Sequence, residues 1–208
     1  SLLIITTLAL FTLIISVSLS KIKELSGGGW VIANALGGQL ITAQAENPLK
    51  RRILNVVDEM AIASGITVPP VYLIEENGIN AFAAGFSPED AVIGVTAGCL
   101  EKLNRQQLQG VMAHEFSHIL NGDMRINIRL SGIIFGIVCI ARIGQSIMDS
   151  CRESRYRDEE DNDSRWYILG LGLFFIGIVG GYLGAMVRSA VSRQREYLAD
   201  ASAIQFTR

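Results

Sequence analysis

Three long hydrophobic runs divide the chain, and amphipathic or charged sequence lies between them. The first run, Leu2–Leu19, and the third run, Tyr167–Val187, contain no charged residue. An α-helix needs about 20 apolar residues to cross the hydrocarbon core of a bilayer. The pattern therefore predicts transmembrane helices at residues 1–20 and 166–188.

The second run, Leu130–Met148, is interrupted by Arg142. An arginine at the centre of a bilayer costs roughly 2.5–3.5 kcal/mol on insertion scales. Its side chain can reach the interface or pair with protein, and a re-entrant or packed helix is the alternative. We expect residues 130–148 to form a second transmembrane or membrane-associated helix.

Residues 149–165, between the second and third runs, are dense in charges of both signs. Such a segment is typical of a solvated loop. An acidic metal-binding loop is the less favoured interpretation, because the acids follow no spaced ligand pattern.

Residues 21–129 alternate between helical and extended patterns. Apolar positions at helical spacing follow Pro48 and stop before Gly65, which predicts a helix. Stretches with a strand pattern follow, the last of them turning into helix: Val68–Glu76, Gly78–Phe86 and Ala91–Leu103. The predicted fold class is α+β and mainly helical, with a small sheet and added transmembrane helices.

Composition and charge narrow the classes of function. Half of the residues are hydrophobic, 18% are charged, and the mean hydropathy of +0.35 is typical of a membrane protein. The net charge of −2 gives no basic surface for nucleic acid. Cys99, Cys139 and Cys151 are far apart and odd in number, so they predict free thiols rather than a disulfide framework or a CxxC metal pair.

A second helix of the soluble part contains the sequence HEFSH. Asn104 is a good N-cap residue, and Gln107 stands three positions later, as in a capping box. Asn121–Asp123 provides a C-terminal stop. The HEFSH sequence is therefore expected near the end of this helix.

The chain's two histidines, His114 and His118, both belong to HEFSH. Residues four apart share one helix face, so the two imidazoles can bind one cation at the distance that zinc needs, about 2.0–2.1 Å. Glu115 is placed one position round the helix, where it can take a proton from water at that metal. A pair of hydrogen-bonded core histidines is the less favoured interpretation.

Such a site needs a third ligand, and no other histidine remains. Ser192–Phe206 has the pattern of a helix in which Glu196 and Asp200 share a face. Glu196 can complete a His2Glu site, and Asp200 can accept a hydrogen bond from the remote nitrogen of a ligand histidine. A surface ion pair of Glu196 with Arg193 or Arg195 is an equal alternative from spacing alone.

Three ordered motifs resemble a known family. HEFSH followed by ILNGD, then the hydrophobic hairpin, then SRQREYLAD are similar to the membrane-bound gluzincin metallopeptidases of the HtpX and CAAX prenyl protease type. The segment GINAFAAG, at Gly78–Gly85, resembles the one that precedes the zinc helix in that family. The resemblance covers nearly the whole chain. It implies a zincin-like metallopeptidase domain at residues 21–129, completed by a third-ligand helix at residues 189–208.

The same resemblance implies roles for single residues. One Zn2+ ion per chain is held by His114, His118 and Glu196. Glu115 is the general base, and Asp200 orients a ligand histidine.

The resemblance also implies where the substrate binds. A strand formed by Asn80, Ala81, Phe82 and Ala83 is the edge to which an extended peptide adds, with main-chain pairing and little sequence selectivity. Asp123 matches the family pattern too, but no role is assigned to it.

The chain departs from the family pattern in one respect. The family places a histidine or arginine downstream that steadies the tetrahedral intermediate, and this chain has no spare histidine. Tyr182, Arg188 and Arg193 are stand-ins within the chain, although the two arginines are better interpreted as interfacial anchors. We expect the family's residue to lie beyond Arg208, in a longer protein.

The predicted function is an integral-membrane zinc endopeptidase that hydrolyses extended or misfolded membrane proteins. Two crossings by the second and third runs return the chain to one side of the bilayer, so that His118 and Glu196 can meet. Basic residues beside the outer runs place this side in the cytoplasm: Lys21, Lys23, Lys50, Arg51, Arg52, Arg188, Arg193 and Arg195. The resemblance implies that the membrane is a bacterial inner membrane. The alternatives are a CAAX-type prenylated-protein protease and a zinc-stabilised membrane scaffold. The pattern leaves the oligomeric state open.

Overall fold

The computed structural model of the chain describes residues 2–42, 44, 47–155 and 163–206. The elements follow in this order: α1 (Leu2–Leu25), α2 (Gly29–Ala35), β1 (Gln39–Leu40), α3 (Pro48–Ser64), β2 (Val71–Ile74), β3 (Ala81–Ala84), the 3-10 turn η1 (Pro88–Asp90), β4 (Val92–Thr96), α4 (Ala97–Lys102), α5 (Arg105–Asn121), α6 (Asp123–Arg155) and α7 (Asp163–Phe206). The predicted class, mainly helical with a small sheet, is confirmed. The chain divides into two compact units, residues 1–24 with 129–190 and residues 25–128 with 191–208.

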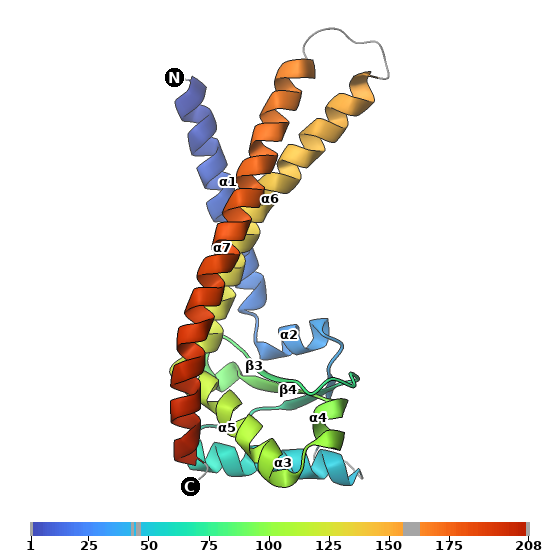
Figure 1. The fold of residues 1–208 in the computed structure, drawn as a ribbon, viewed down its shortest axis with the longest axis vertical. Coiled ribbons are helices and arrows are strands. Elements are labelled where there is room, and N and C mark those ends of the chain that lie inside the picture. The colour runs from blue at the N-terminus through green and yellow to red at the C-terminus, as the bar shows by residue number, and fades with distance from the viewer. Residues whose placement is uncertain (1, 43, 45–46, 156–162, 207–208) are drawn as a thin grey trace. The chain divides into compact units, whose positions relative to one another are not determined.

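The second unit is built on a four-stranded sheet with the order β1–β2–β4–β3. β2 pairs with β4 in parallel, and the two outer pairings are antiparallel. Strand β3 is therefore an edge of the sheet, as predicted for the segment around it. Helix α2 lies over one face, and α3 and α5 lie over the other (Figure 1).

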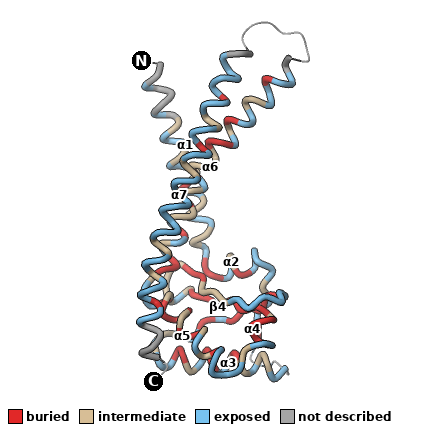
Figure 2. Tube along the Cα trace, viewed as in Figure 1, coloured by how far each residue is buried: buried red, intermediate tan, exposed pale blue. Residues whose placement is uncertain are grey.

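Alternation along the strands explains the two covered faces. Ile93 and Val95 of β4 point into the main core with α3 and α5, whereas Val92 packs with α2 on the opposite face. In β3 the same alternation places Ala83 in the main core and Phe82 toward α2. Figure 2 shows the buried residues of this unit gathered around the sheet.

The helix that supplies the core on the α3 side has clear boundary signals. The side chain of Asn47 accepts a hydrogen bond from the backbone of Leu49, Pro48 follows at the first position, and Gly65 ends the helix in the left-handed conformation. Residues 48–64 were predicted as a helix on these signals, and the structure confirms it.

Close helix packing through glycines characterises the first unit. A Cβ added at Gly136 would lie 2.1 Å from Oγ of Ser18 in α1. One added at Gly144 of α6 would lie 2.5 Å from the carbonyl oxygen of Gly170 in α7. Small residues let helix backbones approach in this way, which is typical of helices packed in membranes.

Two helices of the described chain are long and apolar enough to cross a membrane, namely the segments Asp123–Glu153 and Arg165–Ala201. The N-terminal run is helical over Leu2–Leu25, and its crossing stays a prediction. Arg142 is exposed on α6, and no ion pair joins it to another described residue. This disfavours one of the three ways in which its charge was expected to be accommodated, pairing within the described chain.

Two predicted boundaries differ from the structure. Residues 149–165 were expected to form a loop, but α6 continues to Arg155 and α7 already begins at Asp163; the residues between lie outside the described part. Neither residues 149–155 nor residues 163–165 contain a glycine or proline that would disfavour a helix there. The predicted helices at 166–188 and 189–208 are one continuous helix, α7, through Phe206.

Candidate metal centre

Helix α5 places the two histidines. Its N-cap residue Asn104 accepts a hydrogen bond from the backbone of Gln107, whose side chain returns one to Asn104, so the predicted capping box is confirmed. Gly122 ends the helix with φ 70°. The apolar face of α5 is fully buried against the sheet and α3: Leu108, Met112, Phe116 and Ile119. This packing fixes the helix and holds HEFSH in its last turns.

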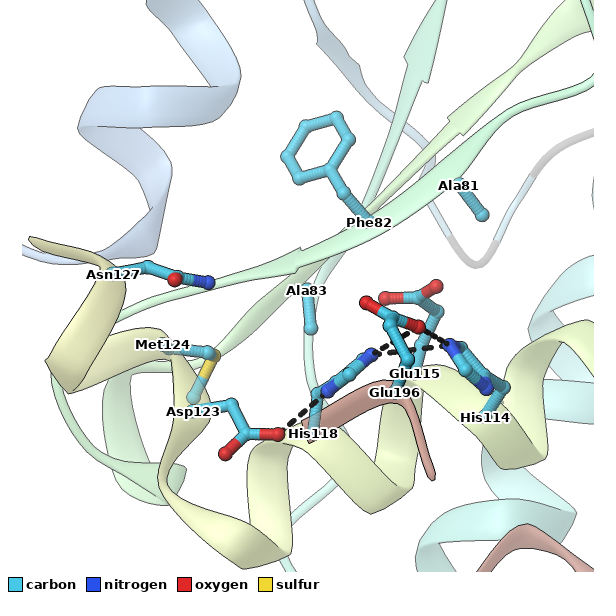
Figure 3. A pocket seen from close by; sticks show the side chains of 10 residues that line it. All are labelled: Ala81, Phe82, Ala83, His114, Glu115, His118, Asp123, Met124, Asn127 and Glu196. Atoms are coloured by element: carbon cyan, nitrogen blue, oxygen red, sulfur yellow. Dashed lines mark hydrogen bonds and ion pairs between the residues drawn. The ribbon is translucent and has the colours of Figure 1, made fainter. Parts of the chain in front are cut away.

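The imidazoles of His114 and His118 face the carboxylate of Glu196, which comes from α7 (Figure 3). The two Nε2 atoms lie 3.1 Å apart. Oε2 of Glu196 is 3.1 Å from Nε2 of His114 and 3.9 Å from Nε2 of His118. Glu196 is far from the two histidines in the sequence, but the fold brings the three potential ligand atoms within 4.8 Å of one another.

Each histidine has a carboxylate at its other ring nitrogen. Nδ1 of His118 lies 2.7 Å from Oδ2 of Asp123, and Nδ1 of His114 lies 2.9 Å from Oδ1 of Asp200. An ionised carboxylate only accepts hydrogen bonds, so both Nδ1 atoms are assigned the ring proton. Both Nε2 atoms are then lone-pair acceptors that face each other and a third acceptor, Glu196.

This donor set fits a metal ion. Three acceptor atoms in mutual contact repel one another unless a cation lies between them. A tetrahedral site with bonds of 2.0–2.1 Å has ligand-to-ligand separations of about 3.3 Å. The observed 3.1, 3.1 and 3.9 Å bracket that value. Two imidazole nitrogens and one carboxylate oxygen are also a ligand set that zinc favours.

Glu115 lies beside the three ligands and is buried, with 8% of its surface exposed. Burial and, to a smaller extent, the Glu196 carboxylate raise the pKa of Glu115, whereas the neighbouring His114 and the backbone N–H of Ala83 lower it, and the net pKa is about 7. A carboxyl with a pKa near neutrality exchanges protons readily at physiological pH. Glu115 is thus suited to general acid–base work.

A pocket of about 230 Å³ opens over these groups, and its walls come from β3, α5, the start of α6 and α7. Ala81, Phe82 and Ala83 of the predicted edge strand line it. Asn80 does not, because it precedes the strand; its carbonyl oxygen accepts hydrogen bonds from the backbone and side chain of Thr96. The strand itself is Ala81–Ala84, one residue later than expected, and its role in substrate binding stays a prediction.

Comparison with known proteins agrees with this geometry. A family model described as "Peptidase family M48" matches residues 47–208. The chain belongs to peptidase family M48. Within this family it is similar to proteins named "Protease HtpX homolog". The one from Dictyoglomus turgidum is 41% identical over 156 residues, which cover 75% of this chain and 49% of the relative.

Two further HtpX homologues support the same placement within M48. The one from Thermoanaerobacter pseudethanolicus is 43% identical over 159 residues, 75% of this chain and 52% of the relative. The one from Streptococcus gordonii is 36% identical over 178 residues, 85% of this chain and 59% of the relative. The chain spans about half the length of the curated relatives it matches first. The HtpX-type resemblance of the motifs is thereby confirmed.

Sequence reasoning left two residues of this M48 site without a role. Asp123 is the first residue of α6 and contacts His118. Arg195 was considered as a surface partner of Glu196, but its guanidinium donates to Oδ1 of Asp123 instead. One signal in the sequence could have identified Asp123. It directly follows Gly122, which ends α5, and a carboxylate is favoured at the first position of the helix that begins there.

Three residues were considered as substitutes for the family's stabilising residue: Tyr182, Arg188 and Arg193. Arg193 belongs to the same unit as the pocket and is not among the described residues that line it. The side chain of Tyr182 is exposed, at 69% of its surface, and the two arginines are exposed as well.

Proposed function

We propose that this chain is the zinc-binding catalytic part of an integral-membrane M48 endopeptidase. The observation that supports it is the convergence of His114, His118 and Glu196, three acceptor atoms, beside the buried Glu115. In this proposal the two histidines and Glu196 hold one Zn2+ ion. Bound there, zinc would act as a Lewis acid that polarises the scissile carbonyl and makes water more acidic.

The chain's own residues would then move the proton. Glu115 accepts a proton from the attacking water as the water oxygen bonds to the carbonyl carbon. It delivers this proton to the amide nitrogen as the C–N bond breaks, which leaves a carboxylic acid and an amine. Asp200 and Asp123 keep Nδ1 of the two histidines protonated, so that each Nε2 keeps its lone pair toward the metal.

The substrate we propose is an extended polypeptide that adds to strand β3. Thr96 donates its backbone N–H to the carbonyl of Asn80 across the antiparallel β3–β4 pairing. Because pairing alternates along an antiparallel strand, the main-chain groups of Ala81 and Ala83 point away from β4. Both residues line the pocket with the metal ligands. The backbone N–H of Ala83 donates to Glu115, so the proposed contact to the substrate is made by the main chain of Ala81. Main-chain recognition there suits misfolded proteins of varied sequence.

The second part of the proposal concerns how the chain is placed in the membrane. Helices α6 and α7 would cross a bacterial inner membrane as a hairpin, with the metal centre in the cytoplasm. The relatives are named as HtpX-type proteases, which favours an HtpX-type protease over a CAAX-type prenylated-protein protease.

The test is Glu115→Gln in the full-length protein, purified in detergent. We expect the zinc content to stay at one ion per chain, while cleavage of an unfolded membrane protein falls by at least about 100-fold, within the range for a lost general base. Glu101→Gln, an exposed change of the same kind on α4, is the matched control. A CAAX peptide assayed in parallel distinguishes the two candidate activities, because only a CAAX-type protease should prefer it to the unfolded membrane protein. Full cleavage by Glu115→Gln would exclude Glu115 as the general base. Bound zinc without any cleavage by the unmodified protein would favour the zinc-stabilised scaffold, and a zinc content near zero in the unmodified protein would exclude the metal site itself.

A further inference from the structure

Asp123 is a buried carboxylate shared by two different elements. Only 4% of its surface is exposed, and it stands at the N-terminus of α6, where the helix dipole favours a negative charge. One oxygen, Oδ2, accepts from Nδ1 of His118 at 2.7 Å. The other, Oδ1, accepts from the guanidinium of Arg195. The ion pair therefore connects a histidine of α5 with α7 through the first residue of α6.

Side-chain burial contributes little to holding this part of α7 in place. Between residues 191 and 201, Ala199 is the only buried residue among those described. Ala199 and Arg195 are four positions apart, so they share one helix face. Glu196 itself is about half exposed, with 51% of its side chain accessible. Burial alone thus gives little constraint on the direction in which Glu196 points.

The ion pair adds a constraint to the contacts of Glu196 and Asp200 with His114. Arg195 and Glu196 are neighbours, so their side chains leave the helix about 100° apart. Once Arg195 is bound to Asp123 and Ala199 is buried, the rotation of α7 about its axis is restricted, and Glu196 lies on the side of the helix that faces the histidines. We infer that Arg195 and Asp123 are positioning residues that dock the third-ligand segment of α7 and align Glu196 with His118 before metal binds. This inference rests on the metal site of the proposed function.

The charges of the pair make this docking specific. Without Arg195, Asp123 would be a buried carboxylate with its remaining hydrogen bond to His118 alone, and an unpaired buried charge is costly. A change at either residue therefore weakens the same contact. The effects of changing both should not add, because the second change removes a contact that is already lost.

The first test measures metal affinity in the full-length protein by competition with a chromophoric zinc chelator. We expect Arg195→Met to weaken zinc binding by about 10-fold or more, the range for a lost partner of a ligand. Arg195→Lys, which keeps the charge, should recover part of the affinity. Arg193→Met removes an exposed arginine two positions away and should leave zinc binding unchanged. The double variant Asp123→Asn/Arg195→Met should bind no more weakly than Asp123→Asn alone.

The second test needs no metal. Hydrogen exchange of the chelator-treated protein should show faster exchange in residues 191–201 of Arg195→Met than of the unmodified chain, with α3 unchanged as the sign of an intact fold. Glu196→Gln should lose zinc but keep slow exchange in this segment, since its docking contact is intact. Equal exchange and equal zinc affinity in Arg195→Met and Arg193→Met would overturn the inference. If the unmodified chain binds no zinc, the proposed function fails, and the exchange comparison still decides whether the pair docks α7.

Discussion

His114 and His118 are each held by a carboxylate, but the two carboxylates lie in different surroundings. Asp123 is buried and bound on both oxygens, whereas 73% of the Asp200 side chain is accessible to solvent. Water competes for an exposed hydrogen bond and screens its charge. The two partners should therefore contribute unequally to the metal centre.

For the exposed partner we predict a small effect. Asp200→Asn should lower zinc affinity by less than about 10-fold, below the range for a well-ordered ligand partner, because water can replace the carboxylate at Nδ1 of His114. The measurement is zinc competition with a chelator at neutral pH. Asp58→Asn, an exposed aspartate of α3, is the control and should have no effect. A loss of about 100-fold would show that exposure does not weaken this contact.

At this scale the sequence predicted what lies close along the chain. The spacing of HEFSH placed His114, His118 and Glu115 on one helix end, and the spacing of Glu196 and Asp200 placed both on one face. The role of Asp123 depends on Arg195, 72 residues away. No periodicity encodes a contact over that separation, so the fold was needed to find it.

Among the elements, β3 contributes its backbone more than its side chains. The main-chain N–H of Ala81 points away from β4, toward the open edge. Proline lacks that N–H and is tolerated in edge strands. A proline at position 81 of β3 would therefore remove one proposed hydrogen bond to the substrate and leave the pairing of β3 with β4 intact.

We predict that Ala81→Pro lowers kcat/KM for unfolded protein about 2- to 10-fold, the worth of one net hydrogen bond of 0.5–1.5 kcal/mol. Zinc content should not change. Ala81→Ser keeps the N–H and serves as the control. Equal kcat/KM in the two variants would argue against strand addition at β3.

The contact of α2 with β3 is unusually close. A Cβ added at Gly29 would lie 2.2 Å from the carbonyl oxygen of Ala84, a backbone atom that cannot rotate away. Gly29→Ala should therefore destabilise the protein by about 1–3 kcal/mol, as overpacking does. Thermal unfolding in detergent, followed by circular dichroism, measures this.

Gly110 provides the opposite case as a control. It lies inside α5 with nothing within 4 Å of an added Cβ. Gly110→Ala should raise the free energy of unfolding by about 0.5–1 kcal/mol, because alanine loses less backbone entropy in a helix. If both variants shift the melting temperature in the same direction, the close contact of Gly29 with Ala84 does not exclude a larger side chain at position 29.

Element types followed from the sequence more closely than element ends. The helix at α3, the capping box of α5 and the strand pattern around β2, β3 and β4 were predicted from local signals. The continuity of α7 was not, because its composition changes from apolar to amphipathic near Arg188, although no glycine or proline follows Gly184 in this helix. A change of environment along one helix was thus interpreted as a boundary between two.

For the whole molecule, the ion pair of Asp123 with Arg195 restricts membrane topology. The two residues touch, so the chain between them crosses the bilayer an even number of times. The described segments Asp123–Glu153 and Arg165–Ala201 are both long and apolar enough to cross. Two crossings would place the turn between α6 and α7 on the side opposite the metal centre.

Cysteine labelling tests this topology in the full-length protein, in a background with Cys99, Cys139 and Cys151 replaced by alanine. Ser150→Cys, at the exposed end of α6, should react with a membrane-impermeant maleimide added to intact right-side-out vesicles. Thr67→Cys, an exposed position after α3, should react only after the vesicles are permeabilised. The charged sequence near Ser150 would not stay in hydrocarbon, so its accessibility reports the side of the membrane rather than depth. Zinc content of both variants verifies that the fold is kept. Labelling of both positions from the same side would mean that α6 and α7 do not form a transmembrane hairpin, even though the metal centre itself would remain intact.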